Sequence, residues 1–169
     1  EVAAKQNNPN AFLQLGNLYS SGHGVEQDYS KAIECFQKAA SLCNSDGLLN
    51  HALCYENGEG VEQSYSKSIE YYEKAASLGN SEALLSLAVH YYNGQGVEQS
   101  YSKYIEFYQK ATSLNNSEAL FGLGFWYFNG DGVSQNNSKA IEFFQKAADL
   151  GNAESMYNLG TCYLNGQGV

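Results

Sequence analysis

A histidine and a cysteine one helical turn apart are the residues of this sequence that could do nucleophilic chemistry. An imidazole beside a thiol can generate a reactive thiolate, provided that a third group orients the imidazole. His51 and Cys54 have helical spacing, but nothing else in the sequence converges on them. We therefore expect an inert pair, no catalytic residue, and a chain that is not an enzyme.

Metal and cofactor chemistry have equally little support among the motifs. The histidines occupy three different settings: His23 a glycine-rich loop, His51 an apolar stripe, and His90 the border of a predicted binding surface. The loop motif G-x-G-V-x-Q follows a helix rather than a strand, and it lacks the third glycine of a dinucleotide-binding loop. The sequence contains no P-loop, G-x-S-x-G or H-E-x-x-H motif. It therefore predicts neither a metal site nor a cofactor.

Composition argues against two classes of partner. The chain has 169 residues and a net charge of −9, and its nine cations are all lysines. An acidic chain without arginine is poorly equipped to neutralise phosphates, so nucleic acid and anionic lipid are unfavourable partners. No apolar run approaches the roughly 18 residues that span a bilayer, so we expect no membrane insertion by this segment. The compartment is not indicated.

The elements that position these residues recur with a fixed period. The string G-x-G-V begins at Gly22, Gly58, Gly94, Gly130 and Gly166, each copy 36 residues after the last. Tyrosine, glutamine, lysine, isoleucine and leucine residues recur at fixed places within the same period. Such self-similarity indicates a repeat protein in which each unit packs on its neighbours.

Each period contains the pattern of two helices, named A and B here. In the first period we expect helix A over residues 9–21 and helix B over residues 29–42. Phe12, Leu15 and Tyr19 fall three and four residues apart, which is typical of one buried stripe. Asparagine precedes helix A in every period, and aspartate, serine or asparagine precedes helix B. All of these are preferred N-caps.

The turns between the helices call for left-handed backbone conformations. After helix B, three periods carry glycine or asparagine, which suit that conformation, whereas the first period carries Cys43. We therefore expect local strain or a shifted helix end at Cys43. In the G-x-G-V loops the glycines are expected to take positive φ. Val25 and its equivalents are then expected to plug into the core.

Two short helices cannot bury their apolar faces alone, so neighbouring pairs must stack. We expect an all-α fold, a right-handed α-solenoid of antiparallel helix pairs. Residues 1–6 match the tail of a preceding helix B, and neither end of the chain has a polar cap, which favours a segment of a longer array. The predicted units are a helix-B tail at 1–6, repeats at 9–44, 45–80, 81–116 and 117–152, and a final helix A at 153–165.

The four cysteines allow one plausible disulfide. Cys35 and Cys54 would lie at similar height across the turn between helices, whereas Cys35–Cys43 and Cys54–Cys162 are too far apart to bridge. Free buried thiols are the favoured alternative, because aromatic residues occupy the Cys35 position in the other repeats.

The repeated pattern resembles a known family. The motif A-x-x-x-L-G-x-x-Y-x-x-G-x-G-V, followed by K-A-I-E-x-F-x-K-A-A-x-x-G-N, is similar to the Sel-1-like repeat, a relative of the tetratricopeptide repeat. It is carried here by Gly16, Tyr19, Gly22, Gly24, Val25, Lys31, Ala32, Lys38, Ala39 and Ala40. The resemblance covers essentially the whole chain. It implies an adaptor or scaffold, as in endoplasmic-reticulum degradation, signalling and bacterial host-interaction complexes.

The resemblance also has limits at particular residues. His51 stands where the family has leucine. Ala40 and Leu48 stand where the disulfide-rich bacterial branch of the family has cysteine, so the chain does not resemble that branch. Neither departure alters the expected fold.

By analogy with the tetratricopeptide groove, a partner is expected on the concave side lined by the A helices. An exposed, contiguous apolar patch marks an interaction site, and aromatic residues dominate the energetics of such sites. The alternative is that these side chains pack against the neighbouring A helix. The predicted groove residues are Leu49, Leu53, Leu85, Val89, Tyr92, Phe121, Phe125, Trp126, Phe128 and Tyr157.

Polar residues border this predicted groove. An acidic rim is expected from Asp46, Glu82, Glu118 and Glu154. Carboxylates at a helix N-terminus are stabilising in any case, so this rim has a structural explanation of equal weight. A ladder of amides that could clamp a peptide backbone consists of Asn57, Asn93 and Asn129, although capping of the helix ends explains it better. The expected partner is a peptide or helix of another protein, apolar with basic character.

Two other functions are compatible with the same pattern. The array could be the regulatory or substrate-recruiting arm of a larger enzyme, which the full-length sequence would reveal. It could also bind cell-wall glycans or peptides through its aromatic groove, which a glycan array would test.

Overall fold

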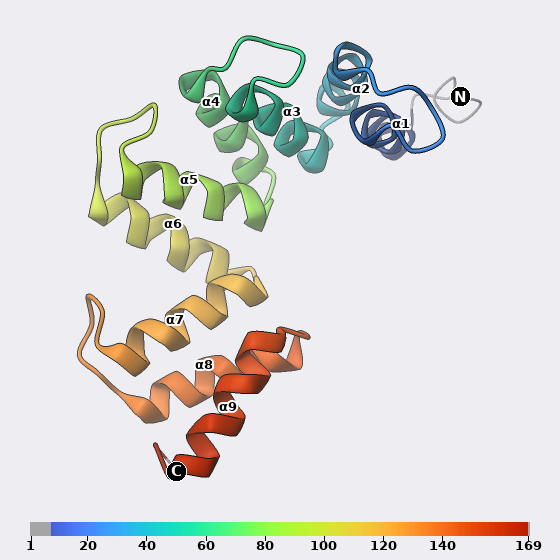
Figure 1. Cartoon of the computed structure of the whole chain (residues 1–169). Coiled ribbons are helices and arrows are strands. Elements are labelled where there is room, and N and C mark those ends of the chain that lie inside the picture. Colours follow the sequence, from blue (N-terminus) through green and yellow to red (C-terminus); the bar gives the residue numbers. More distant parts are fainter. Residues whose placement is uncertain (1–7, 169) are drawn as a thin grey trace. The chain divides into compact units, whose positions relative to one another are not determined.

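The computed structural model describes residues 8–168, and over this range the chain forms nine α-helices and no strand (Figure 1). The A helices are α1 (Pro9–Ser21), α3 (Ser45–Asn57), α5 (Ser81–Asn93), α7 (Ser117–Asn129) and α9 (Ala153–Asn165). The B helices are α2 (Tyr29–Ser41), α4 (Tyr65–Ser77), α6 (Tyr101–Ser113) and α8 (Asn137–Asp149). Consecutive helices pack on one another, which confirms the predicted all-α fold of helix-pair repeats. The tail predicted for residues 1–6 lies outside the described residues.

Side-chain caps determine where the helices begin. The Oδ1 atom of Asn8 accepts a hydrogen bond from the N–H of Asn10 at 3.0 Å, and that of Asn44 accepts one from Gly47 at 2.7 Å. Equivalent caps open the later A helices at Asn80, Asn116 and Asn152, and B helices at Asp28, Ser64 and Asn136. These bonds satisfy N–H groups that have no partner inside the helix. The helix starts inferred from the sequence are therefore confirmed.

The turn that follows each B helix contains a left-handed residue. Gly79 and Gly151 adopt φ angles of 83° and 90° there, and Asn115 adopts 56°. Cys43 adopts a φ of 58°, which places its Cβ too close to the following carbonyl oxygen, at a cost of roughly 1–2 kcal/mol. The strain expected at Cys43 is confirmed.

The G-x-G-V loop is held by its glycines and by a glutamine that follows it. Both glycines of each loop have positive φ, as expected. The Nε2 of Gln27 donates to the carbonyl of Ser20 at 2.7 Å, and the same bond recurs in the next three repeats. Val61 and Val97 are half-buried and pack against core clusters, but Val25 is 37% exposed. The prediction that Val25 plugs into the core is wrong for the first loop.

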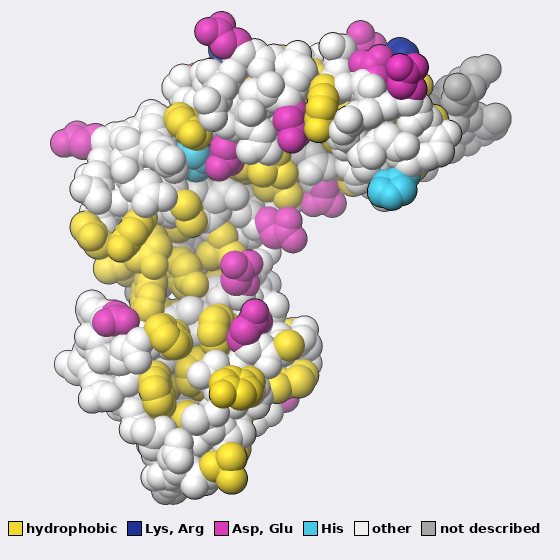
Figure 2. All heavy atoms as spheres, viewed as in Figure 1, with side chains coloured by type: hydrophobic (Ala, Val, Ile, Leu, Met, Phe, Trp, Pro, Cys, Tyr) yellow, Lys and Arg dark blue, Asp and Glu magenta, His cyan; other side chains and the backbone are white. Residues whose placement is uncertain are grey.

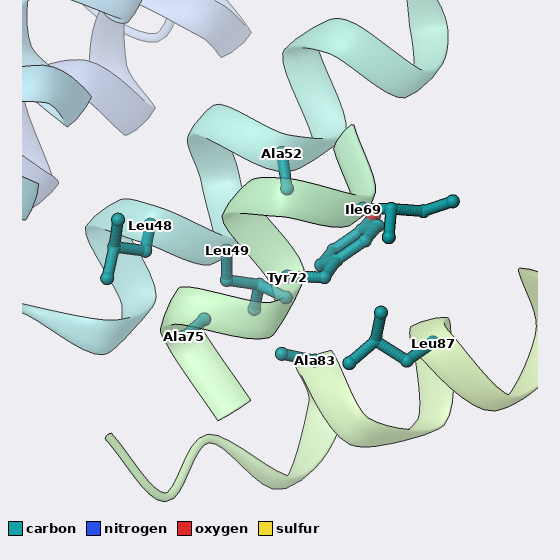
Figure 3. Close-up of a cluster of buried hydrophobic side chains, with 8 residues drawn as sticks. All are labelled: Leu48, Leu49, Ala52, Ile69, Tyr72, Ala75, Ala83 and Leu87. Carbon is teal, nitrogen blue, oxygen red and sulfur yellow. The ribbon is translucent and has the colours of Figure 1, made fainter. Parts of the chain in front are cut away.

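The described helices divide into two compact units, one ending at Phe107 and the other beginning at Tyr108, within α6. The best-filled cluster of the first unit has Tyr72 at its centre with no exposed surface (Figure 3). Around Tyr72 lie Leu48, Leu49, Ala52, Ile69, Ala75, Ala83 and Leu87. In the second unit the equivalent centre is Phe144, which is also fully buried.

A glycine on α1 and another on α7 allow the aromatic ring of the following B helix to approach. A Cβ added at Gly16 would collide with the ring of Phe36, and one at Gly124 would collide with the ring of Phe144. Both collisions involve rings packed in the core, so these glycines bring the helices close together. At Gly160 of α9 nothing lies within 4 Å of an added Cβ.

Candidate protein-binding surface

In the first unit, the A helices expose apolar side chains beside the buried stripe. Leu53 of α3 is 36% exposed, and Val89 and Tyr92 of α5 are 51% and 44% exposed. These three residues are called the first-unit patch below. The ring of Tyr92 contacts those of Tyr101 and Tyr104 at centroid distances of 5.4 and 5.1 Å, which fixes its orientation at the surface.

Two other residues predicted for the groove of this unit lie deeper. Leu49 is buried in the cluster around Tyr72, so it supports the fold and cannot reach a partner. Leu85 is half-buried. Asn57 and Asn93 are exposed, and each precedes a left-handed glycine whose N–H closes the helix end. Sequence position alone did not distinguish Leu49 from Leu53, because both lie outside the predicted core stripe.

In the second unit, most of the predicted aromatic residues pack partly inward. Phe121 and Phe128 are half-buried against Phe144, with centroid distances of 5.9 and 6.4 Å. Trp126 is half-buried and lies 4.7 Å from the ring of Tyr108. The alternative left open by the sequence was packing against the neighbouring A helix, whereas these rings contact the B helices α8 and α6. A ring that turns inward contributes to the packing of the core, so fewer rings are exposed to a partner than the sequence pattern suggests.

The outward side chains of the second unit lie on α7 and α9. Phe125 is 43% exposed and Tyr157 is 76% exposed. Met156, at 53%, was not among the predicted groove residues, because its equivalent in the first repeat is Phe12 of the predicted buried stripe. Asn129 is exposed, and its Nδ2 donates to Asp131 at 3.2 Å. Phe125, Met156 and Tyr157 are called the second-unit patch below.

Acidic side chains accompany both patches. Asp46, Glu82, Glu118 and Glu154 are all exposed in the first turns of their A helices. The Oδ1 of Asp46 accepts a hydrogen bond from the side chain of Asn80 at 2.8 Å, linking α3 to the start of α5. Figure 2 shows acidic side chains between the hydrophobic patches of the face it draws, and few lysines.

Among residues 8–168, the lysines all belong to the other helix of each pair. The A helices of the described chain contain no lysine, whereas each B helix contains two. Most of them lie over aromatic rings: Lys67 is 5.2 Å from the ring of Tyr55 and Lys103 is 4.5 Å from that of Tyr91. Cations held over aromatic faces in this way are attracted by the ring quadrupole. The helices α3, α5, α7 and α9 therefore carry acidic residues and no lysine of their own, although Lys67 and Lys103 reach the tyrosine rings of α3 and α5.

Three polar side chains meet under the first-unit patch, and the sequence analysis did not predict them as a group. The Tyr72 hydroxyl of α4 donates to Oε2 of Glu56 on α3 at 2.5 Å. The Nε2 of His90 on α5 lies 3.6 Å from the same oxygen. His90 and Tyr72, foremost His90, hold the pKa of Glu56 below its usual range, against the effect of burial. The available signal was that Glu56 is the charged residue of its column and His90 the ionisable ring of its column; Tyr72 gave no signal, since Tyr108 occupies the same place in the next repeat.

Burial of His51 and Cys54 disfavours nucleophilic chemistry at this pair. His51 is 1% exposed, its ring lies 4.1 Å from that of Tyr71, and its Nδ1 has no hydrogen-bond partner. Burial lowers its pKa to about 4, with Lys74 the second cause. Burial raises the pKa of the Cys54 thiol to about 11, so the thiolate that nucleophilic chemistry needs is disfavoured.

The structure also bears on a disulfide, a metal site and a membrane span. All four cysteines are free thiols, so Cys35 and Cys54 form no disulfide. Among residues 8–168, no cluster of three or more histidine, cysteine, aspartate or glutamate side chains could hold a metal ion. In the same range no helix is long and apolar enough to cross a membrane.

These features define a helical-repeat protein: similar helix pairs packed through small residues and aromatic rings, with exposed apolar side chains on the A helices. The sequence pattern of the Sel1 repeat matches residues 10–42, 45–80, 81–116, 117–152 and 153–169. The chain therefore belongs to the Sel1 repeat family. Proteins of this family are in general protein-interaction scaffolds, and the fold is typically non-catalytic.

Solved structures of related proteins are similar over most of the chain. A Sel1 repeat protein from Oxalobacter formigenes is 30% identical with a TM-score of 0.85, over 96% of this chain and 66% of that one. The protective antigen c5321 of uropathogenic Escherichia coli, which displays an SLR fold, is 33% identical with a TM-score of 0.81. That match covers 99% of this chain and 36% of the antigen, so this chain spans about a third of the antigen's length.

A third solved structure is more distant. Cysteine rich protein B of Helicobacter pylori is 28% identical with a TM-score of 0.60, over 79% of this chain and 96% of its own length. Among the curated protein sequences, none matches this chain.

Proposed function

We propose that this chain is a non-catalytic scaffold that binds a peptide or helix of another protein through the exposed side chains of its A helices. The observation that carries the proposal is the first-unit patch: Leu53, Val89 and Tyr92 are exposed on neighbouring A helices that carry no cation. Exposed apolar side chains that gather on one face are typical of interaction sites. The family's general role as a scaffold supports this interpretation.

The second-unit patch supplies a second set of contacts. Phe125 and Tyr157 offer large rigid rings, the type of side chain that contributes most to binding energy at interfaces. Glu82 and Glu118 place negative charge in the first turns of α5 and α7. Exposed amides are available at Asn57, Asn93 and Asn129. The half-buried Leu85 would support the first-unit patch, and the half-buried Phe121, Trp126 and Phe128 would support the second-unit patch.

The charge distribution favours a partner with basic character. Five acidic residues and no lysine lie on the described A helices, while the lysines of the B helices lie mostly over aromatic rings. Complementary charge directs encounter and excludes like-charged partners. We therefore propose an apolar segment with lysine or arginine residues as the ligand.

The proposal can be tested by selecting binders from a displayed library of random peptides on the wild-type chain. Val89→Asp should weaken the selected peptides at least about tenfold, equivalent to ~1.4 kcal/mol, because it places a charge in the patch. The matched control is Leu78→Asp, since Leu78 is 47% exposed but lies in the turn after α4. Equal binding by both variants would contradict the proposal, and circular dichroism checks that both remain helical.

A further inference from the structure

We infer that Glu56 is the anchor that recognises a lysine or arginine side chain of the bound partner. This inference rests on the proposed function and specifies it at one residue. Glu56 lies on α3 one turn after Leu53, so the carboxylate and the apolar side chain share a helix face. Its side chain is 31% exposed, which leaves part of the carboxylate open to solvent.

Two buried side chains lie against the carboxylate of Glu56. Tyr72 has no exposed surface, and its hydroxyl donates to Oε2 of Glu56. His90 on α5 is 1% exposed, and its ring centroid lies 5.8 Å from that of Tyr72. Two rigid neighbours on two further helices restrict the carboxylate to one place. A preorganised charge loses less conformational entropy when a ligand binds.

The hydrogen bonds of this cluster are incomplete. The Nδ1 of His90 lies 3.0 Å from the carbonyl oxygen of Gln95, which can only accept, so Nδ1 carries a proton. The Nε2 of His90 faces Glu56 but has no hydrogen-bond partner, since 3.6 Å exceeds hydrogen-bond length. An ionised carboxylate accepts about four hydrogen bonds. Tyr72 supplies one, so the carboxylate retains capacity for a donor from the solvent side.

The surroundings suit a long cationic side chain. Val89 and Tyr92 flank His90 in α5 and are exposed, so the outer edge of the site is apolar. Lysine and arginine side chains have apolar stems that pack on such surfaces while the charged end reaches a carboxylate. Neither α3 nor α5 carries a lysine that could occupy the site itself.

The same cluster could instead serve only to satisfy the buried hydroxyl of Tyr72. Glu56→Gln separates the two roles, because a glutamine oxygen still accepts from Tyr72 but the charge is lost. The control is Glu34→Gln, which makes the same change of charge at an exposed position on α2. Both variants should unfold in urea at nearly the wild-type midpoint.

The probes are the peptides that a displayed random library yields on the wild-type chain. We expect a lysine or arginine at a fixed position among apolar residues, and at least about a tenfold weaker affinity for Glu56→Gln than for Glu34→Gln. Replacing the peptide's basic residue by norleucine should weaken binding to the wild-type chain about tenfold and leave binding to Glu56→Gln nearly unchanged. Such coupling identifies the two groups as direct partners.

Two outcomes would overturn the inference. Selected peptides could lack a basic residue, or the norleucine change could cost the same affinity with Glu56→Gln as with the wild-type chain. If those peptides still lose affinity for Val89→Asp, the proposed scaffold function stands and the role of Glu56 is rejected. A selection that yields no binder contradicts both proposals.

Discussion

His51 occupies a position that leucine holds in the other repeats, at Leu15, Leu87, Leu123 and Leu159. Burial lowers its pKa from 6.5 to about 4, so the folded state favours the neutral ring. As the pH falls below about 6.5, the unfolded chain takes up a proton that the folded chain resists. Stability is therefore lost with falling pH, and the loss levels off below about pH 4.

We expect His51 to lower the free energy of unfolding by about 2 kcal/mol as the pH falls from 7 to 5. His51→Leu should remove that component and also the unpartnered Nδ1, adding about 1 kcal/mol at pH 7. Urea unfolding of both proteins at the two pH values measures the difference. Parallel pH dependence in the two proteins would show that His51 does not titrate as its burial requires.

The residue scale is also where the sequence was least informative about the binding surface. The column containing Leu49 and the column containing Leu53 both lie outside the predicted stripe, yet one is buried and the other is exposed. Phe125 and Phe128 differ in a similar way, because Phe128 turns onto the ring of Phe144. Which side a side chain faces depends on the packing of the next helix, and a single-helix periodicity does not contain it.

At the scale of elements, two glycines at the same place in the A helix have different surroundings: one contacts an aromatic ring of the B helix and the other has no neighbour. Gly16 lies under the ring of Phe36, which is 2% exposed, while Gly160 has open space above it. Alanine has a better helix propensity than glycine by about 1 kcal/mol. The same substitution should therefore have opposite signs at the two positions.

Gly16→Ala should destabilise the chain by about 1–3 kcal/mol, because the ring of Phe36 must move within a filled core. Gly160→Ala should stabilise α9, by up to about 1 kcal/mol. Thermal unfolding followed by circular dichroism measures both variants against the wild-type chain. A stabilising effect at both positions would mean that the helix pair opens without cost.

The helices themselves were predictable because residues close in sequence determine where each helix begins and ends. Asparagine caps and left-handed glycines act within a few residues, so the bounds of α1 inferred from the sequence agree with the structure. The cluster of Glu56, Tyr72 and His90 was not predictable, since it joins three helices. Periodicity within one helix gives no relation between the three residues, which only the placement of the helices side by side brings together.

For the molecule as a whole, lysine is confined to one helix of each pair. Every described lysine lies on a B helix, whereas acidic residues lie on the B helices and on α3, α5, α7 and α9. We expect association with a basic peptide to slow as salt is added. Raising the ionic strength from about 0.1 M to about 1 M shortens the screening length from about 10 Å to about 3 Å.

Stopped-flow measurement of the association rate across this range tests the expectation, and the dissociation rate should change less. A peptide in which the basic residues are replaced by norleucine provides the control, since its association rate should not depend on salt. An equal salt dependence for the two peptides would assign the effect to something other than the acidic A helices.

The lysines held over tyrosine and phenylalanine rings have a consequence for how a ligand arrives. Lys67 lies over the ring of Tyr55, so this amine stays beside α3, while Glu70 and Glu73 balance the two lysines within α4. The helix pair therefore keeps the net negative charge of Asp46 and Glu56, and it attracts a cationic segment before any atoms touch. An amine restrained over a ring has less freedom to reach those carboxylates and to compete with the arriving ligand.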